Sequence, residues 1–203
     1  MDPYLATALA MCAIVFIALA GTAWLAVYFN RRAKADLERL LTPLAEIVGG
    51  SVNVDDAEVR GSYCRNLVMA RMANAAAGTV RLFRIDMIDA AGGEPWSFLW
   101  TRPRKGATAP RVEFTSEHPE VRHHLELLRE EALAPLKPLA SDWIHLEYNP
   151  EAGHVRFERP MRSRNEIPDP ETFRAQLDYL CALADANRAL QEQLRAGQKD
   201  VVP

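Results

Sequence analysis

The sequence contains no charged residue between Asp2 and Arg31, and this absence is its most informative feature. The stretch from Leu5 to Phe29 is almost wholly apolar, and as a helix it is long enough to cross a bilayer core of about 30 Å. A secretory signal would need basic residues before the apolar run, whereas here they follow it, which disfavours cleavage. Residues 1–30 are therefore predicted to be a single transmembrane anchor.

Residues typical of the membrane–water interface flank this stretch. Amphipathic aromatic rings favour the headgroup level, and positive charge resists translocation. We therefore expect the N-terminus to lie outside and the C-terminal part to lie in the cytoplasm, at a plasma membrane or bacterial inner membrane. The predicted interface residues are Tyr4, Trp24, Tyr28, Arg31, Arg32 and Lys34.

The chain also lacks the signatures of common catalytic and cofactor chemistry. Cys12, Cys64 and Cys181 are isolated, so no C-x-x-C pair is available for zinc, redox or iron–sulfur chemistry. The glycine pairs 49–50 and 92–93 lack the further residues of phosphate-binding loops. We therefore expect no catalytic residue, no metal site and no cofactor.

Positive charge is too sparse for nucleic acid. All 24 basic residues and 26 of the 27 acidic residues follow residue 30, which leaves the soluble part at a net charge of −2. Nucleic-acid binding needs a concentrated basic surface. The local exceptions are Arg102, Arg104 and Lys105 in one loop and Arg162 and Arg164 in a later linker, which are candidate contacts to lipid headgroups or a partner. An ordinary solvated loop is the equal alternative.

Beyond the anchor, an α+β fold is predicted. Residues 31–50 should form an amphipathic helical connector that Pro43 interrupts and two glycines end. Residues 51–196 are enough for one cytoplasmic domain of antiparallel β-hairpins packed with helices, followed by a flexible tail over 197–203.

Alternating apolar and polar residues predict the strands of this domain. Residues 59–63 and 67–72 should form a hairpin around a three-residue turn in which Asn66 takes a positive φ. Residues 80–88 and 96–101 should extend it as a meander with one aromatic face, and 111–114 should add an edge strand. A helix is then expected from Ser116 to Ala132, where the adjacent His123 and His124 cannot share a metal and at least one should face solvent.

A second hairpin is predicted with a specific register. With the loop at residues 150–153, Tyr148 pairs with Val155, and Leu146 pairs with Phe157. Two polar pairs alternate with these, Glu147 with Arg156 and His145 with Glu158. The last pair could be an acid–base couple, but a surface polar pair is the favoured interpretation.

The final helix, predicted over residues 170–194 with Asp169 as its cap, carries a wide apolar stripe. The width favours packing of its first half against the domain's own sheet over a coiled-coil homodimer. The candidate partner-helix residues in its second half are Leu183, Asn187, Leu190 and Leu194.

These patterns favour a non-catalytic accessory, assembly or scaffold subunit of a membrane protein complex, and a respiratory or photosynthetic complex is a natural host by analogy. The expected partners are the lipid bilayer and that larger complex, not nucleic acid. The alternative is a membrane-tethered sensor or small-ligand-binding domain, in which Trp96, Phe98 and Trp100 line a pocket. An enzyme ranks third.

Overall fold

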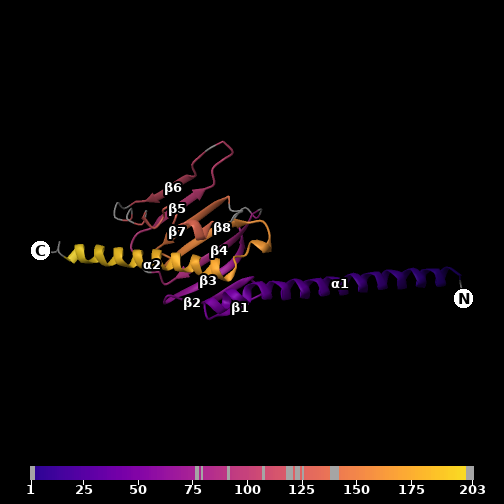
Figure 1. The fold of residues 1–203 in the computed structure, drawn as a ribbon. Coiled ribbons are helices and arrows are strands. Elements are labelled where there is room, and N and C mark those ends of the chain that lie inside the picture. The colour runs from indigo at the N-terminus through magenta and orange to yellow at the C-terminus, as the bar shows by residue number, and fades with distance from the viewer. Residues whose placement is uncertain are drawn as a thin grey trace. The chain divides into compact units, whose positions relative to one another are not determined.

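The α+β class is confirmed, with one N-terminal apolar helix, an eight-stranded antiparallel sheet and a C-terminal helix (Figure 1). The structure, a computed structural model, describes residues 3–75, 78, 80–90, 92–106, 108–117, 121, 124, 126–137 and 142–199. The chain forms two compact units, Met1–Arg39 and Leu40–Pro203.

The first unit consists of the candidate membrane span. Helix α1, Pro3–Ile47, is long and apolar enough to cross a bilayer, and every side chain from Met11 to Arg32 is exposed. Trp24 and Tyr28 stack on each other with ring centroids 5.7 Å apart, as expected for neighbours four residues apart on a helix. An exposed apolar surface of this extent is suited to lipid contact.

The predicted interruption at Pro43 is wrong, because α1 continues through this residue to Ile47. Proline removes one backbone hydrogen bond, but Leu41 and Leu44 on the same turns are each 1% exposed. Their packing within the second unit offsets the missing bond. The helix ends at Ile47, just before the predicted glycine pair, and Gly49 takes a φ of 57°.

Eight strands form one sheet in the order β1-β2-β3-β4-β8-β7-β5-β6, with every neighbouring pair antiparallel. The β7–β8 hairpin lies between β4 and β5, so the predicted meander is correct for β2, β3 and β4 but not for β5, and the short strand β1 was not predicted. Strand β6 is an edge, as predicted. The strands are β1 Ser51–Asn53, β2 Glu58–Tyr63, β3 Asn66–Asn74, β4 Arg81–Ile88, β5 Trp96–Thr101, β6 Arg111–Ser116, β7 Trp143–Asn149 and β8 His154–Met161.

The sequence predicted one of the two hairpins more accurately than the other. The β7–β8 register is confirmed, with Leu146 opposite Phe157 and Tyr148 opposite Val155. The β2–β3 turn has two residues instead of three, and Cys64 and Arg65 have φ values of 47° and 67° while Asn66 begins β3. Such a turn matches the right-handed twist of the flanking strands.

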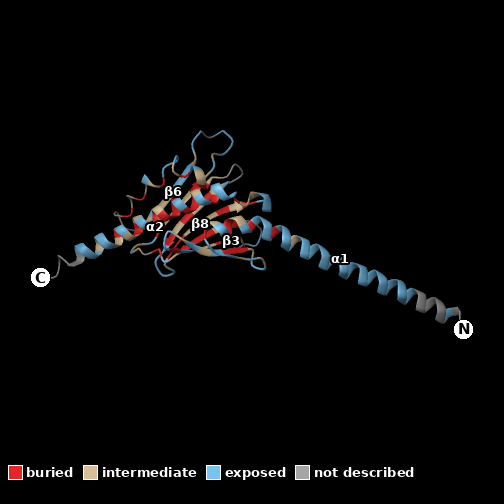
Figure 2. Ribbon diagram, turned by 60° about the horizontal axis from the view of Figure 1, so that its bottom comes forward, coloured by how far each residue is buried: buried red, intermediate tan, exposed pale blue. Residues whose placement is uncertain are grey.

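All described helices of the second unit pack on one face of the sheet, which we call the covered face (Figure 2). Phe173 of α2, Pro170–Lys199, contacts Phe83 with ring centroids 6.4 Å apart. The end of α1 reaches the same face, since a side chain at Gly61 would lie 2.4 Å from the Val48 carbonyl oxygen. The short helices η2, Ala134–Leu136, and η3, Arg164–Glu166, border this side as well. The opposite face is called the open face.

The predicted helix over 116–132 is wrong for its described residues. Ser116 belongs to β6, whereas Val121, His124 and Glu126 are in 3₁₀ conformation, and from 127 to 133 the chain forms turns and a bend. Pro135 lies in η2 instead of simply ending a helix. Val121, Leu128 and Leu133 are nevertheless buried. The apolar spacing thus indicated that this segment packs in the core, but it did not indicate the correct secondary structure. His123 and Leu125 lie outside the described residues.

Helix α2 follows the predicted cap closely. The Asp169 carboxylate accepts hydrogen bonds from the backbone N–H and the hydroxyl of Thr172, both at 2.9 Å. The apolar stripe is buried well beyond the first half of the helix, because Leu183, Asn187 and Leu190 are at most 3% exposed. These three residues therefore pack in the domain's own core and are not a surface for a partner helix, while Leu194 is half-buried.

Candidate functional site

The open face carries two rows of charged side chains that run across neighbouring strands. In the first row, Arg84 of β4 lies opposite Glu158 of β8, which lies opposite His145 of β7. In the second row, Asp86 lies opposite Arg156, which lies opposite Glu147. Because successive side chains of a strand alternate between faces, these rows come from the same strands as the core.

The second row is a continuous ion-pair chain. Arg156 Nε donates to Asp86 Oδ1 at 2.6 Å, and Arg156 Nη1 donates to Glu147 Oε1 at 2.9 Å. Arg71 Nη2 lies 3.7 Å from the second Asp86 oxygen. The Asp86 side chain is only 5% exposed, so these contacts compensate a carboxylate that is almost removed from water.

The first row places the proposed acid–base couple in a structural network. Glu158 has Arg84 at one oxygen, and His145 Nδ1 lies 3.9 Å from the other. The contact with His145 and the charges of Arg84 and Arg156 lower the pKa of Glu158, although burial opposes this. A carboxylate with a lowered pKa is a weak general base, which favours the interpretation of the two residues as a structural pair.

His154 extends this face toward the turn of the hairpin. It is 8% exposed, and burial together with the Arg156 charge lowers its pKa. The imidazole is therefore neutral at pH 7 and adds no charge to the rows. Within the described part of the chain, no group of three or more His, Cys, Asp or Glu side chains is arranged to hold a metal ion.

The two predicted basic segments meet at Asp142, which precedes β7. The backbone N–H of Arg102 donates to the Asp142 carbonyl at 2.9 Å, and Arg162 Nη2 lies 3.3 Å from its carboxylate. Arg104, Lys105 and the side chain of Arg164 remain exposed at this end of the sheet. The sequence placed these residues 60 positions apart, and the fold brings the two segments together.

A hollow of about 590 Å³ lies against these residues. Its floor includes Leu99 and Thr101 on the open face, and its walls include Arg102, Arg104 and Arg111. Arg111 is paired with Glu113. Trp143 and His145 line a shallower apolar depression beside it. We call the 590 Å³ hollow, together with Arg102, Arg104 and Arg111, the basic hollow.

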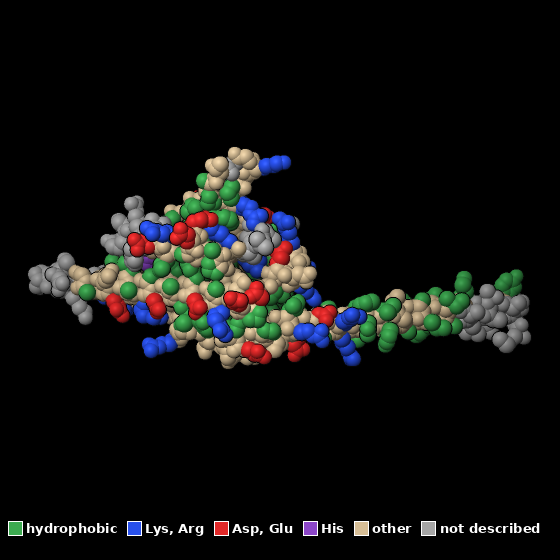
Figure 3. All heavy atoms as spheres, viewed as in Figure 1, with side chains coloured by type: hydrophobic (Ala, Val, Ile, Leu, Met, Phe, Trp, Pro, Cys, Tyr) green, Lys and Arg blue, Asp and Glu red, His purple; other side chains and the backbone are tan. Residues whose placement is uncertain are grey.

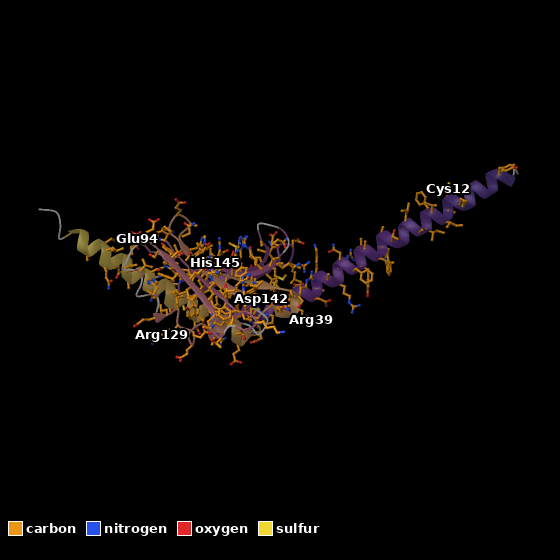
Figure 4. The ribbon with its side chains drawn as sticks, turned by 90° about the horizontal axis from the view of Figure 1, so that it is seen from above. Cys12, Arg39, Glu94, Arg129, Asp142 and His145 are labelled. Atoms are coloured by element: carbon orange, nitrogen blue, oxygen red, sulfur yellow. The ribbon has the colours of Figure 1, made fainter. Side chains whose placement is uncertain are left out.

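The opposite end of strands β5, β6 and β7 is acidic. A hollow of about 400 Å³ there is lined by Glu117, Glu147 and Glu151. Figure 4 shows Asp142 and Glu94 toward opposite ends of the domain, with His145 between them. On the face drawn in Figure 3, by contrast, basic and acidic side chains are interspersed. Charge separation is thus a property of the two ends of these three strands.

The covered face holds a polar cluster that sequence reasoning missed. Trp96 Nε1 donates to Asn187 Oδ1 at 2.9 Å, and His124 Nε2 lies 2.7 Å from the same oxygen. Because an amide oxygen only accepts, His124 carries its proton on Nε2. His124 is fully buried. Because His123 lies outside the described residues, the expectation that at least one of the two histidines faces solvent stays a prediction.

The aromatic strand face forms core and not an open pocket. Trp96, Phe98 and Trp100 are at most 5% exposed, and Trp100 Nε1 donates to Glu130 Oε2 at 3.1 Å. Comparison of the chain with protein-family models, with curated proteins and with solved structures finds no significant match.

Proposed function

We propose that this protein is a non-catalytic accessory, assembly or scaffold subunit of a membrane protein complex, anchored by α1. The observation that carries the proposal is the combination of a lipid-suited helix with a domain that leaves one broad, charge-paired sheet face open. The aromatic side chains that a sensor pocket would need are instead packed in the core. The open face is the surface we assign to the partner.

The chemistry of the open face supports a binding role over a catalytic one. Asp86 and Glu158 are both paired with arginines of neighbouring strands, as in a structural ion-pair network. A protein partner can bury such a face without leaving charges unpaired in the interface, because each charge already has its counter-ion within the domain.

The proposed orientation places the domain in the cytoplasm. Arg31, Arg32 and Lys34 follow the uncharged span, and positive charge is retained on the cytoplasmic side. The basic hollow supports this placement, since each cation near an anionic leaflet contributes about 1 kcal/mol. The acidic end of β5, β6 and β7 would be repelled by the same surface, so the two ends together would orient the domain.

Affinity purification of the tagged full-length protein in mild detergent tests the partner proposal. We expect other chains to co-purify in fixed stoichiometry and to migrate with it as a large species on a native gel. A double variant on the open face, Ser97→Arg with Leu99→Arg, should reduce this recovery at least tenfold. Glu171→Arg on the exposed side of α2 is the matched control. A small homogeneous particle without co-purifying chains would contradict the proposal.

Native Cys64 reports the orientation, because it is exposed while Cys181 is buried. A membrane-impermeant maleimide should leave Cys64 unlabelled in intact spheroplasts and label it after permeabilisation. Cys64→Ser provides the background. Full labelling before permeabilisation would place the domain outside and remove the argument for contact with a cytoplasmic leaflet.

A further inference from the structure

A separate cavity of about 390 Å³ lies where the chain passes from β8 into α2. Its lining combines apolar groups from Pro135, Ile167 and Pro168 with polar groups from Lys137, Arg159 and Asn165. Its size lies within the usual range for small-molecule sites. None of these residues belongs to the open face or to the basic hollow.

Arg159 is the unusual member of this lining. The residue is 1% exposed, and its guanidinium lies 5.2 Å from the centroid of the Phe83 ring. Nη2 donates to the Glu166 carbonyl oxygen, whereas Nε and Nη1 are buried without a hydrogen-bond partner. Burial lowers the pKa of Arg159 to about 10, so the side chain is still charged at pH 7.

This arrangement is costly for a purely structural residue. A buried charge is normally paired, because a charge that is removed from water without a counter-ion is strongly unfavourable. No carboxylate of the described residues forms an ion pair with Arg159. An anion supplied from outside the chain would remove this deficit.

The acidic side chains at the cavity have other partners. Glu166 accepts from the Arg162 backbone N–H at 2.9 Å, and Asp169 is held by Thr172. Lys137 Nζ, the second cation, is paired with Glu130. The nearby negative charges disfavour a dianion such as phosphate and leave a single negative charge as the better match for Arg159.

We propose that this cavity binds a small organic monocarboxylate, whose carboxylate pairs with Arg159 and whose apolar body packs against Pro135, Ile167 and Pro168. Guanidinium and carboxylate groups match each other in planarity and hydrogen-bonding pattern. Nε and Nη1 are shielded from water in this structure, so the proposal includes a rotation of the Arg159 side chain that brings them to the carboxylate. The proposal is independent of the partner complex, since the cavity lies on the covered side of the sheet.

Calorimetric titration of the full-length protein in lipid nanodiscs tests the site with butyrate, hexanoate and benzoate, and with inorganic phosphate as the dianionic comparison. We expect saturable binding of at least one carboxylate in the millimolar range or tighter, and weaker binding of phosphate. Arg159→Met should weaken carboxylate binding at least tenfold. Arg195→Met, which removes an exposed arginine near the end of α2, should leave the affinity unchanged.

A second variant separates loss of the site from loss of the fold. Ile167→Trp fills the cavity while keeping Arg159, and it should abolish binding with an unchanged circular dichroism spectrum. If Arg159→Met does not fold, the Ile167→Trp variant alone tests whether the ligand binds in this cavity. The proposal is overturned if none of the three carboxylates binds saturably, if phosphate binds more tightly than they do, or if a folded Arg159→Met or Ile167→Trp protein binds as well as the wild type.

Discussion

On the covered face, strands β4 and β8 contribute Phe83, Ile85 and Phe157, each at most 1% exposed. On the open face the same strands contribute Arg84, Asp86 and Arg156. The covered face is stabilised by removing apolar surface from water beneath α2. The open face has no helix among the described elements and is stabilised by charges that satisfy each other laterally. One sheet can thus provide a core and a wide polar surface without exposing a large apolar patch.

The largest expected difference between the faces comes from a core truncation. Phe157→Ala should lower the free energy of unfolding by about 3–5 kcal/mol, because it removes a fully buried ring and leaves a cavity. Urea denaturation of the full-length protein, followed by tryptophan fluorescence, measures this. A loss below about 1 kcal/mol would show that α2 does not cover this part of the sheet.

Removal of Arg156 tests the open face. Arg156→Met should cost about 1.5–3 kcal/mol, because Asp86 loses its closest counter-ion while it remains nearly buried. The additional change Asp86→Asn should recover part of that loss, since the uncompensated charge is then gone. If the double variant is as unstable as the two single losses added together, the charged rows are not coupled.

The buried amide of Asn187 tests the polar cluster within the covered face. Asn187→Leu should cost about 1–3 kcal/mol, because Trp96 Nε1 and His124 Nε2 lose their shared acceptor in the core. Gln193→Leu, on the exposed side of the same helix, is the control and should change stability by less than about 0.5 kcal/mol. A cost as small as the control's would mean that water replaces the amide.

Acid should produce the smallest effect, and Glu158 is the group that reports it on the open face. The pKa of Glu158 is lowered in the folded state relative to the unfolded chain, chiefly by the contact with His145. Its contribution to stability is therefore present above the unfolded value and is lost as the pH falls through the folded value. The wild type should lose more stability than Glu158→Gln between about pH 6 and about pH 3 in urea titrations. Equal losses of stability in the two proteins would show that ionised Glu158 does not stabilise the folded state.

Short-range patterns predicted the parts of the fold that depend on neighbours in the chain. The β7–β8 register was predictable because apolar and complementary polar pairs alternate around one short loop. The cap at Asp169 was predictable because a side-chain oxygen three residues before Thr172 satisfies a free helix N–H. The turn around Cys64 and Arg65 was located, but its two-residue length was not predicted, since neither residue type favours a positive φ.

The candidate sites were harder to predict than the elements that carry them. The basic residues of the 102–110 loop and of the 161–169 linker were predicted together as candidate contacts. Their shared partner Asp142 could not be predicted, because it depends on the pairing of β5 with β7. Arg159 gave no signal, because it alternates with Glu158 and Pro160 as an ordinary strand residue would. Its burial becomes evident only once η3 and α2 lie on the covered face.

By itself, the sequence determined the apolar span, the strand periodicity and the wide stripe of α2, because each follows from chemistry within a few residues of chain. Tertiary structure decided that β7 and β8 lie between β4 and β5, since period-two alternation specifies faces and not neighbours. It also decided that Asn187 is a core acceptor instead of a dimer contact, because the partners of a buried polar group come from distant segments, here Trp96 and His124.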